Sequence, residues 1–382
     1  MKKRKICVVT GSRGEYGYIR PVIKEIASCS ELEYFVVATN MLLLPEFGFA
    51  INSFLEDGID VKYRIDMAIS GFSNSSMTKS LGLFIQSLSD IFSNDLPDII
   101  LLAGDRGEQL GGAIAGAHFN ILTAHIQAGE LSGNIDGMTR HAITKFVHLH
   151  FASNEDAAIR LKKMGEQEFR IFNLGAPQLD DFSSYQYMDK IKFYNHFRLD
   201  ISKPFCILLQ HSITEESELG EEQMSRTVDA LIKKGEQAIV IHPNNDAGSL
   251  GITKVLGSVA SRQLRIVKNV NREMFANMLN LAEYLIGNSS SGILEAPTFK
   301  LPAVNIGRRQ KGRLQGENVI NVSDFNIEEI VNAINIAKSK DFRGKLKNLK
   351  NPYGDGMSSK RIVEVLRNVP FSPKYYLKEL TY

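Results

Sequence analysis

The sequence predicts an α/β protein with two domains, each built around a parallel sheet. Short β-branched runs alternate with amphipathic stretches along most of the chain, which is the strand and helix order of a parallel sheet covered on both faces. The alternation weakens between residues 175 and 204 and then resumes, so we expect the connection between the domains there. The length of 382 residues and the hydrophobic fraction of 43% suit two domains of roughly 100 to 200 residues each.

The first domain is expected to alternate strands with amphipathic helices. Strands are predicted at Lys5–Thr10, Tyr34–Thr39, Asp98–Ala103, Ile121–Ile126, His148–Ala152 and Arg170–Leu174. Leucine-rich and alanine-rich segments predict helices over Arg20–Ala27, Gly107–His118 and Glu155–Met164. The apolar stretch Leu81–Ile91 carries Phe84 and Leu88 at helical spacing, which suits the core and also an interface between copies of the chain.

The second domain repeats this order of elements. Its strands are predicted at Phe205–Gln210, Ala238–His242, Leu264–Val267, Tyr284–Gly287, Pro302–Ile306 and Val319–Val322. A last helix over about Ser358–Arg367 is amphipathic and could pack on either domain.

Charge and cysteine content narrow the class of protein. The 45 Lys and Arg residues nearly balance the 43 Asp and Glu residues, and this net charge of +2 argues against a nucleic-acid binder. A net charge this close to zero still allows a local basic pocket for one small anion. Cys7, Cys29 and Cys206 are an odd number without close pairing, so we expect free thiols. Apolar runs are too short for a membrane span or an export signal, which favours a soluble, cytoplasmic protein.

Parallel sheets bind ligands where loops leave the carboxyl ends of strands, and these loops are polar here. The loop Gly11–Gly17 lacks the glycine spacing of a dinucleotide fingerprint, but its turn at a helix start could offer backbone N–H groups to a phosphate beside Arg13. A tight turn with a solvated arginine is the alternative. Asp105 and Arg106 end another strand, where Asp105 could face a ligand or cap the next helix.

A third loop follows the strand that ends at Ile126. It places Gln127, Glu130 and Asp136 within ten residues, which indicates either an acid/base cluster or a solvated loop. His148 and His150 point to one face of a strand, but they lack a further Cys or His nearby, so we do not expect a metal site.

The sharpest signal in the second domain follows Gly287. Small hydroxyl residues, including Ser289 and Ser290, open a predicted helix, where a diphosphate would meet unpaired N–H groups. Glu295, one turn further along, could accept hydrogen bonds from ribose hydroxyls. The basic loop Gly307–Arg313 is either a phosphate clamp or a solvated loop.

These segments, in this order, resemble the hydrolysing UDP-N-acetylglucosamine 2-epimerases, the first enzymes of sialic acid synthesis. The matching motifs are Gly-Asp-Arg at 104–106, Ser-Gly-x-Ile-Asp at 132–136, Arg-His-Ala-Ile-Thr-Lys at 140–145, Pro-Asn-x-Asp-Ala-Gly-Ser at 243–249, Gly-Asn-Ser-Ser at 287–290 and Tyr-Gly-Asp-Gly at 353–356. The resemblance implies a GT-B-like fold, with Rossmann-like domains at residues 1–175 and 176–357 facing a central cleft. It also implies that residues 358–382 pack back on the first domain.

The same resemblance implies roles for single residues. Positions that hold UDP and the sugar are matched by Arg13, Arg106, His211, Asn244, Asp246, Ser289, Ser290, Glu295 and Arg309, and the candidate catalytic residues are Asp105, Gln127, Glu130, Asp136 and His211. Gln127 stands where relatives carry a glutamate, and an amide cannot transfer a proton. Either another of these acids carries that role, or the substrate differs. Tyr18 replaces the lysine of the non-hydrolysing relatives, which favours the hydrolysing branch.

The implied reaction converts UDP-N-acetylglucosamine and water to UDP and N-acetylmannosamine through a 2-acetamidoglucal. It requires no metal or redox cofactor, and the expected partners are the UDP-sugar and other copies of the chain in a homodimer or homotetramer, without nucleic acid or membrane. The alternatives are a UDP-2,4-diacetamido-2,4,6-trideoxy sugar as substrate, a glycosyltransferase of the same fold and a catalytically inactive sugar-nucleotide sensor.

Overall fold

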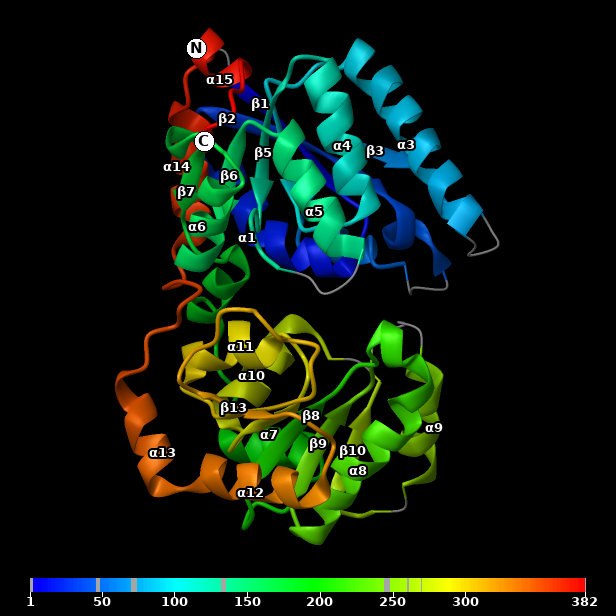
Figure 1. Ribbon diagram of the computed structural model, residues 1–382, viewed down its shortest axis with the longest axis vertical. Helices are drawn as coiled ribbons and strands as arrows, with labels where there is room; N and C mark the ends of the chain where they lie inside the picture. The colour runs from blue at the N-terminus through cyan, green and yellow to red at the C-terminus, as the bar shows by residue number, and fades with distance from the viewer. Residues whose placement is uncertain are drawn as a thin grey trace. The chain divides into compact units, whose positions relative to one another are not determined.

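The structure is a computed structural model, and the chain in it divides into two compact units. It describes residues 3–45, 49–69, 74–131, 135–243, 248–259, 261–268 and 270–381, without the side chains of Arg13, Asn74, Ile135, Asp136 and Thr214. Unit 1 comprises Met1–Asp181 and Tyr353–Tyr382, and unit 2 comprises Phe182–Pro352. Each unit is a parallel sheet flanked by helices (Figure 1), so the predicted α/β class is confirmed. In the described part of the chain, no helix is long and apolar enough to cross a membrane.

Unit 1 contains a parallel sheet with the strand order β3-β2-β1-β4-β5-β6-β7. Its strands are β1 (Arg4–Thr10), β2 (Leu32–Thr39), β3 (Tyr63–Ile65), β4 (Ile99–Ala103), β5 (Leu122–Ile126), β6 (Leu149–Ala152) and β7 (Ile171–Asn173). The order reverses between β1 and β4, and such a reversal opens the crevice in which Rossmann-like sheets bind ligands. Strand β3 has three residues, too short a run for the sequence pattern to predict.

Helices follow most of these strands. They are α1 (Arg13–Ser28), α2 (Asn52–Glu56), α3 (Asn74–Asn94), α4 (Gly107–His118), α5 (Ile135–Phe146), α6 (Glu155–Lys163), α14 (Ser358–Asn368) and α15 (Pro373–Tyr376), with 3₁₀ turns η1 (Asn40–Leu43), η3 (Glu168–Arg170) and η4 (Pro177–Ser183). Helix α5 covers a segment for which the sequence indicated only a loop. Phe84 and Leu88 of α3 are fully buried, which confirms the core interpretation for both.

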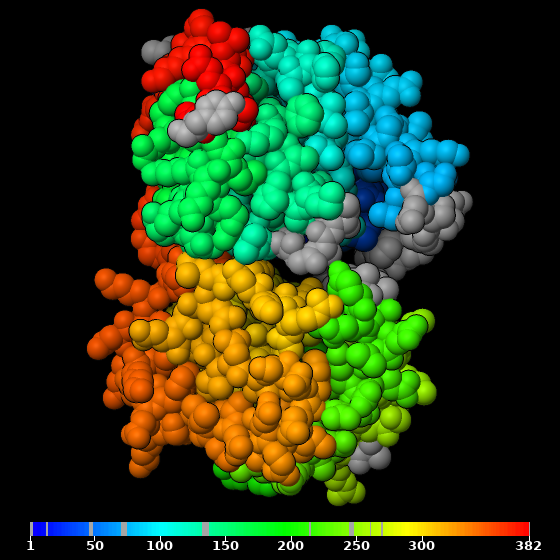
Figure 2. Space-filling model, viewed as in Figure 1, coloured from blue at the N-terminus to red at the C-terminus, as the bar shows by residue number. Residues whose placement is uncertain are grey.

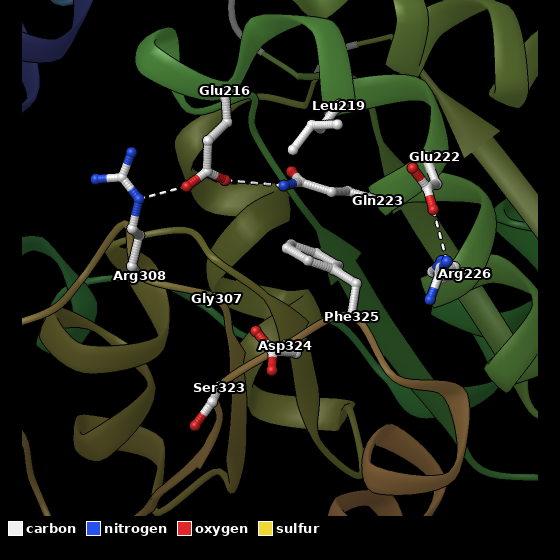
Figure 3. Close-up of a pocket in the computed structure, with 10 residues that line it drawn as sticks. All are labelled: Glu216, Leu219, Glu222, Gln223, Arg226, Gly307, Arg308, Ser323, Asp324 and Phe325. Atoms are coloured by element: carbon white, nitrogen blue, oxygen red, sulfur yellow. Dashed lines mark hydrogen bonds and ion pairs between the residues drawn. The ribbon is translucent and has the colours of Figure 1, made fainter.

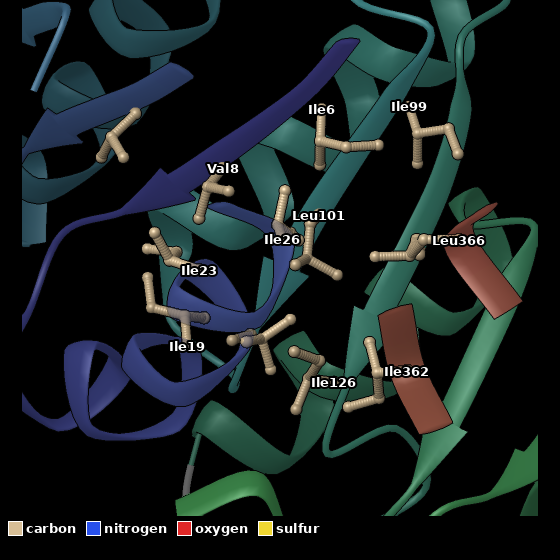
Figure 4. Packing of buried hydrophobic residues seen from close by; sticks show 14 of the residues in the cluster. Ile6, Val8, Ile19, Ile23, Ile26, Ile99, Leu101, Ile126, Ile362 and Leu366 are labelled. Carbon is tan, nitrogen blue, oxygen red and sulfur yellow. The ribbon is translucent and has the colours of Figure 1, made fainter. Parts of the chain in front are cut away.

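Both faces of the unit 1 sheet are buried, as the apolar run of β1 requires. Ile6 and Val8 belong to a core shared with α1 and α14, whereas Cys7 and Val9 belong to the core on the opposite face, shared with α3 and α4. Figure 4 shows residues of α1 and α14 around the first core. Each fully buried aliphatic side chain contributes roughly 1.5–3 kcal/mol, so α14 is an integral part of unit 1 although it lies at the end of the chain.

Buried polar groups fix this returning segment. Asp180 accepts the first N–H groups of α14, from Ser358 at 3.1 Å and Ser359 at 2.5 Å. Arg170, which is fully buried, donates to the carbonyl oxygens of Lys374, Tyr375 and Leu377, each at 2.7 Å. The C-terminal residues, red in Figure 2, therefore lie on the surface of unit 1 and contact Arg170 of η3.

Unit 2 contains a parallel sheet with the order β10-β9-β8-β11-β12-β13, again reversed beside its first strand. Its elements are α7 (Lys190–His196), β8 (Phe205–Leu209), η5 (Thr214–Leu219), α8 (Gly220–Lys233), β9 (Gln237–Ile241), α9 (Ser249–Ser258), β10 (Leu264–Val267), α10 (Arg272–Leu281), β11 (Leu285–Gly287), α11 (Ser291–Leu294), η6 (Ala296–Phe299), β12 (Ala303–Ile306), β13 (Val319–Val322), α12 (Ile327–Lys338), α13 (Lys340–Lys345) and η7 (Leu346–Asn348). Helices α8, α9 and α12 share one core with the sheet. The three cysteines of the chain are free, as predicted, and Cys206 lies in this core.

Candidate functional site

The switch point of unit 1 is the place where the strand order reverses, between the carboxyl ends of β1 and β4. One amide side chain links these two strand ends. Gln109 of α4 accepts the N–H of Ala103 at 3.0 Å and donates to the carbonyl of Val9 at 3.3 Å. These two residues lie at the carboxyl ends of β4 and β1, and Gln109 is fully buried. The loops that begin at Gly11 and Gly104 therefore leave the sheet from a fixed point.

Asp105 is positioned by an arginine rather than by a helix cap. The cap of α4 is Arg106 without a side-chain hydrogen bond, so the alternative of Asp105 as a cap is wrong. Arg140 of α5 pairs with the Asp105 carboxylate and donates to the carbonyl of Gln127 at 2.8 Å. The Asp105 side chain is 21% exposed and Arg140 6%, so the carboxylate is fixed from within and open on one edge. Such a carboxylate can accept a proton from a bound substrate.

Gln127 occupies a strained backbone position at the end of β5. Its φ is +62°, which non-glycine residues rarely adopt, and its side chain is 4% exposed. Backbone strain of this kind is concentrated at functional sites because the surrounding structure must enforce it. The hydrogen bond from Arg140 to its carbonyl is one such constraint.

Glu130 is buried and faces the start of α6. It accepts a hydrogen bond from the amide of Asn154 at 2.5 Å, and Asn154 caps α6 through the N–H of Ala157. His125 is the second-last residue of β5, and it donates to the carbonyl of Gly104 at 2.6 Å. Burial lowers the pKa of His125 to about 3, so it is a neutral donor that supports the turn at Gly104.

An acid occupies two N–H groups of the glycine-rich turn, so these two are not available to a phosphate. Glu15 accepts the N–H groups of Gly11 at 2.6 Å and Ser12 at 3.1 Å, and Ser12 in turn caps α1 through the N–H of Glu15. This is a capping box, with the Ser-x-x-Glu spacing that defines it.

Several predicted residues are placed only in part. Arg13 begins α1 and Asp136 lies in the first turn of α5, but the side chains of both are outside the described residues. Asn244 and Asp246 lie entirely outside the described residues. Asp136 therefore lies on the same helix as Arg140. The ion pair between Arg140 and Asp105 joins this helix, α5, to the end of β4.

In unit 2, Asn288 fixes the loop that carries His211. Its side chain accepts the N–H of His211 at 2.7 Å and donates to the His211 carbonyl at 2.8 Å, and Asn288 is fully buried. A Cβ on the preceding Gly287 would lie 2.2 Å from the carbonyl oxygen of Leu209, so only glycine at this position allows the ends of β8 and β11 to approach this closely. His211 and the serine loop are thus brought together at the switch point.

The serine loop, Asn288–Ser291, leads into a shorter helix than expected. Helix α11 has four residues, and Ser289 receives the N–H of Ser291 at 3.3 Å. Glu295 lies after it, 7% exposed, and is paired with Arg272 of α10. The Arg272 guanidinium also lies over the ring of Phe182, 4.7 Å from its centre. Glu295 therefore has a fixed orientation that sequence spacing alone did not define.

The basic loop after β12 has protein partners for two of its arginines, so it is not wholly solvated. Arg309 donates to the carbonyl of Asn288 at 3.3 Å, which places it at the switch point. Arg308 is paired with Glu216 and lines a cavity of about 350 Å³ (Figure 3). Phe325 points into this cavity, which Gly307 and Arg308 of the basic loop line but none of the residues matched to UDP, sugar or catalysis does.

The two strand histidines have protein partners. His148 accepts the N–H of Thr123 at 3.0 Å, and His150 lies 2.9 Å from the carboxylate of Glu166. Among the described residues, no group of three or more His, Cys, Asp and Glu side chains is arranged to hold a metal ion.

Sequence reasoning assigned no role to four residues that position the site, although two of them, Arg140 and Asn288, lie in motifs that the chain shares with the family it resembles. Arg140, Gln109, Asn288 and Arg272 each hold a predicted residue or its loop, and each acts from an adjacent helix or loop. The spacing Ser12-x-x-Glu15 was the signal that could have revealed the closed turn.

Comparison with known proteins places these features in one family. The family model described as UDP-N-acetylglucosamine 2-epimerase matches residues 24–367. A UDP-N,N′-diacetylbacillosamine 2-epimerase (hydrolyzing) of Legionella pneumophila is 35% identical over 368 residues, 96% of each chain. A UDP-N-acetylglucosamine 2-epimerase of Neisseria meningitidis is 31% identical over 369 residues, 96% of this chain and 95% of the relative.

Solved structures agree on the fold. The crystal structure of UDP-GlcNAc 2-epimerase from Neisseria meningitidis bound to UDP-GlcNAc matches with a TM-score of 0.80 and 20% identity, covering 95% of this chain and 99% of that one. The fold of the chain is thus the GT-B-like one expected from the sequence, with a Rossmann-like parallel sheet in each unit. By the family match and by identity over nearly its whole length, the chain belongs to the UDP-N-acetylglucosamine 2-epimerase family.

Proposed function

We propose that this protein is a hydrolysing 2-epimerase of a UDP-linked 2-acetamido sugar. The observation that carries the proposal is Asp105, a carboxylate fixed by Arg140 at the switch point of unit 1 and open on one edge. In this proposal Asp105 takes part in proton transfer at C2, and Arg106 next to it stabilises the leaving diphosphate. Tyr18, in place of the lysine of non-hydrolysing relatives, supports the hydrolysing outcome.

The chemistry explains why an acid and cations are needed together. The C2 proton of the sugar is hardly acidic until the C1–O bond begins to break, so UDP departure accompanies proton removal. A carboxylate takes the C2 proton, UDP carries away the C1–O electron pair, and a 2-acetamidoglucal forms. Water then adds to C1 while a proton returns to the opposite face of C2. The products are UDP and the free 2-epimer of the sugar.

For the sugar, we propose UDP-N,N′-diacetylbacillosamine ahead of UDP-N-acetylglucosamine, which reverses the order that the sequence motifs favoured. The support is the 35% identity to the Legionella pneumophila relative, against 31% to the Neisseria meningitidis one. Gln127 also departs from the glutamate of the simplest family members. UDP-N-acetylglucosamine is the second candidate because the Neisseria relative and its solved structure carry that name.

One experiment tests both the reaction and the sugar. Purified protein is incubated in D₂O with each UDP-sugar, and UDP, free sugar and deuterium at C2 are followed by NMR. We expect release of UDP and of a deuterated free 2-epimer, faster with the diacetamido sugar. Faster turnover of UDP-N-acetylglucosamine would overturn the choice of sugar. Release of UDP without deuterium at C2 would overturn the elimination mechanism and indicate simple hydrolysis or glycosyl transfer, and a UDP-bound 2-epimer would overturn the hydrolysing assignment.

A further inference from the structure

Two buried carboxyl groups lie on either side of Gly11, where β1 ends. Glu15 of α1 and Glu108 of α4 are each 2% exposed. Glu15 Oε2 accepts the N–H of Gly11 at 2.6 Å, and a Cβ built on Gly11 would lie 2.3 Å from Glu108 Oε1. A side chain at position 11 would require the Glu108 carboxyl group to move. The two glutamates come from the helices that follow β1 and β4.

Each carboxyl group has one oxygen without a hydrogen-bond donor. Within the described residues, Glu15 Oε1 and Glu108 Oε1 are buried and accept no hydrogen bond, although Arg106 Nε forms an ion pair with Glu108 Oε1 at 3.4 Å. The other Glu108 oxygen accepts from Asn40 at 3.2 Å. A buried oxygen that lacks a donor costs about 1–3 kcal/mol, so a state with one of the two carboxyl groups protonated is favoured over two bare carboxylates.

The charges around the pair favour the same state. Burial, followed by the Glu108 carboxylate, raises the pKa of Glu15 well above its ordinary value, whereas Arg106 and the N–H groups of Gly11 and Ser12 act in the opposite direction. One guanidinium therefore faces two carboxyl groups, and adjacent buried carboxyls do not ionise together without a large cost. Asn40 is a neutral donor, and the ring of Tyr18 lies against Gly104 beside the Glu15 side chain.

We propose that Glu15 and Glu108 share one proton and act as a positioning pair that fixes the turn after β1 and the guanidinium of Arg106. With the proton in place, a single negative charge faces Arg106, and the turn stays closed by the Glu15 capping box. Loss of the proton at high pH places two like charges around Gly11, which opens the turn and displaces Arg106. The catalytic consequence rests on the proposed function, in which Arg106 stabilises the leaving diphosphate.

The first test is spectroscopic and does not depend on the substrate. Infrared spectra of the full chain near neutral pH should show the carbonyl stretch of a neutral carboxylic acid. This band should weaken in both Glu15→Gln and Glu108→Gln and persist in Glu25→Gln, a matched change at a less buried position of the same helix. A band that is unchanged in both pair variants would overturn the shared proton, whichever UDP-sugar the enzyme uses.

The second test is the pH profile of kcat/KM. Glu15→Ala should lower kcat/KM at neutral pH by roughly 10- to 100-fold. Glu15→Gln, whose amide can accept from Gly11 and donate to Glu108, should restore most of this loss and shift the alkaline limb to higher pH. Equal losses in the Ala and Gln variants, or an unchanged alkaline limb in Glu15→Gln, would overturn the positioning role. If Glu15→Ala does not fold, the Glu15→Gln profile and the infrared spectra still decide.

Discussion

The guanidinium of Arg140 holds the carboxylate of Asp105, and this pair joins α5 to the end of β4. The same guanidinium donates to the carbonyl of Gln127 at 2.8 Å, so one side chain fixes the loops after two adjacent strands. Arg140 is nearly buried, whereas Asp105 is open on one edge, so the arginine holds the carboxylate from the interior of the unit and leaves that edge accessible to solvent. A carboxylate held in this way loses little conformational entropy when it meets a substrate.

Replacing Arg140 by Met should therefore impair the reaction more than it impairs folding. We expect kcat/KM to fall by roughly 10- to 100-fold, because Asp105 loses its orientation, and the free energy of unfolding to fall by about 1–3 kcal/mol. Steady-state kinetics and chemical denaturation measure the two effects. Arg20→Met is the matched control, since Arg20 is a half-buried guanidinium that bridges Asp57 and Asp181. A similar loss of kcat/KM in both variants would show that Arg140 acts only through stability.

Asp105→Asn should separate catalysis from nucleotide binding. The amide keeps the shape of the side chain and can still accept from Arg140, but it cannot take a proton, so kcat should fall by roughly 10²- to 10⁴-fold. The Kd for UDP, measured by isothermal titration calorimetry, should change by less than about 3-fold. Asp156→Asn serves as the control, because Asp156 is an exposed partner of Arg160 on α6. Unchanged turnover in Asp105→Asn would exclude Asp105 as a proton-transfer group.

The sequence was sufficient for every strand except β3 and for the loops that carry chemistry. Buried parallel strands are continuous β-branched runs, and polar residues directly after them mark the ligand edge of the sheet, so Asp105 and His211 could be placed from local pattern alone. Strand β3 and helix α5 were missed. Three residues carry too little pattern, and the polar start of α5 resembles a loop until its apolar residues are seen against the sheet.

What the sequence could not provide is the set of partners that come from distant positions. Arg140 lies 35 residues from Asp105, and Asn288 lies 77 residues from His211. No local rule pairs such residues, because the strand order brings them together. The turn at Gly11 was missed although its signal is local: the Ser12-x-x-Glu15 spacing predicts a capping box, and the turn was interpreted as a site for a phosphate instead.

Asn288→Ala should weaken UDP binding because it releases the backbone of His211, and this effect does not require Asn288 itself to contact UDP. The variant leaves the N–H and carbonyl of His211 without their side-chain partners, which should lower the free energy of unfolding by about 1–3 kcal/mol and raise the Kd for UDP by roughly 10-fold. Asn321→Ala is the control, because Asn321 is an exposed residue of unit 2 that also makes side-chain hydrogen bonds. An unaltered Kd for UDP in Asn288→Ala would contradict a role for the His211 loop in nucleotide binding.

Buried neutral histidines should make unit 1 sensitive to acid. Burial, helped by the charges of Lys378 and Arg170, lowers the pKa of His148 from its ordinary value of 6.5 to about 4. Between these values the unfolded chain binds a proton that the folded chain does not, so the free energy of unfolding falls as pH decreases from about 6.5 to 4. For His148 this loss amounts to about 3 kcal/mol at most. In His148→Gln the amide can still accept the N–H of Thr123 but cannot titrate, so denaturant unfolding at a series of pH values should show a shallower acid loss than in the wild type. His118→Gln, an exposed change on α4, should keep the wild-type slope; equal slopes in His148→Gln and the wild type would mean that His148 is already protonated in the folded protein.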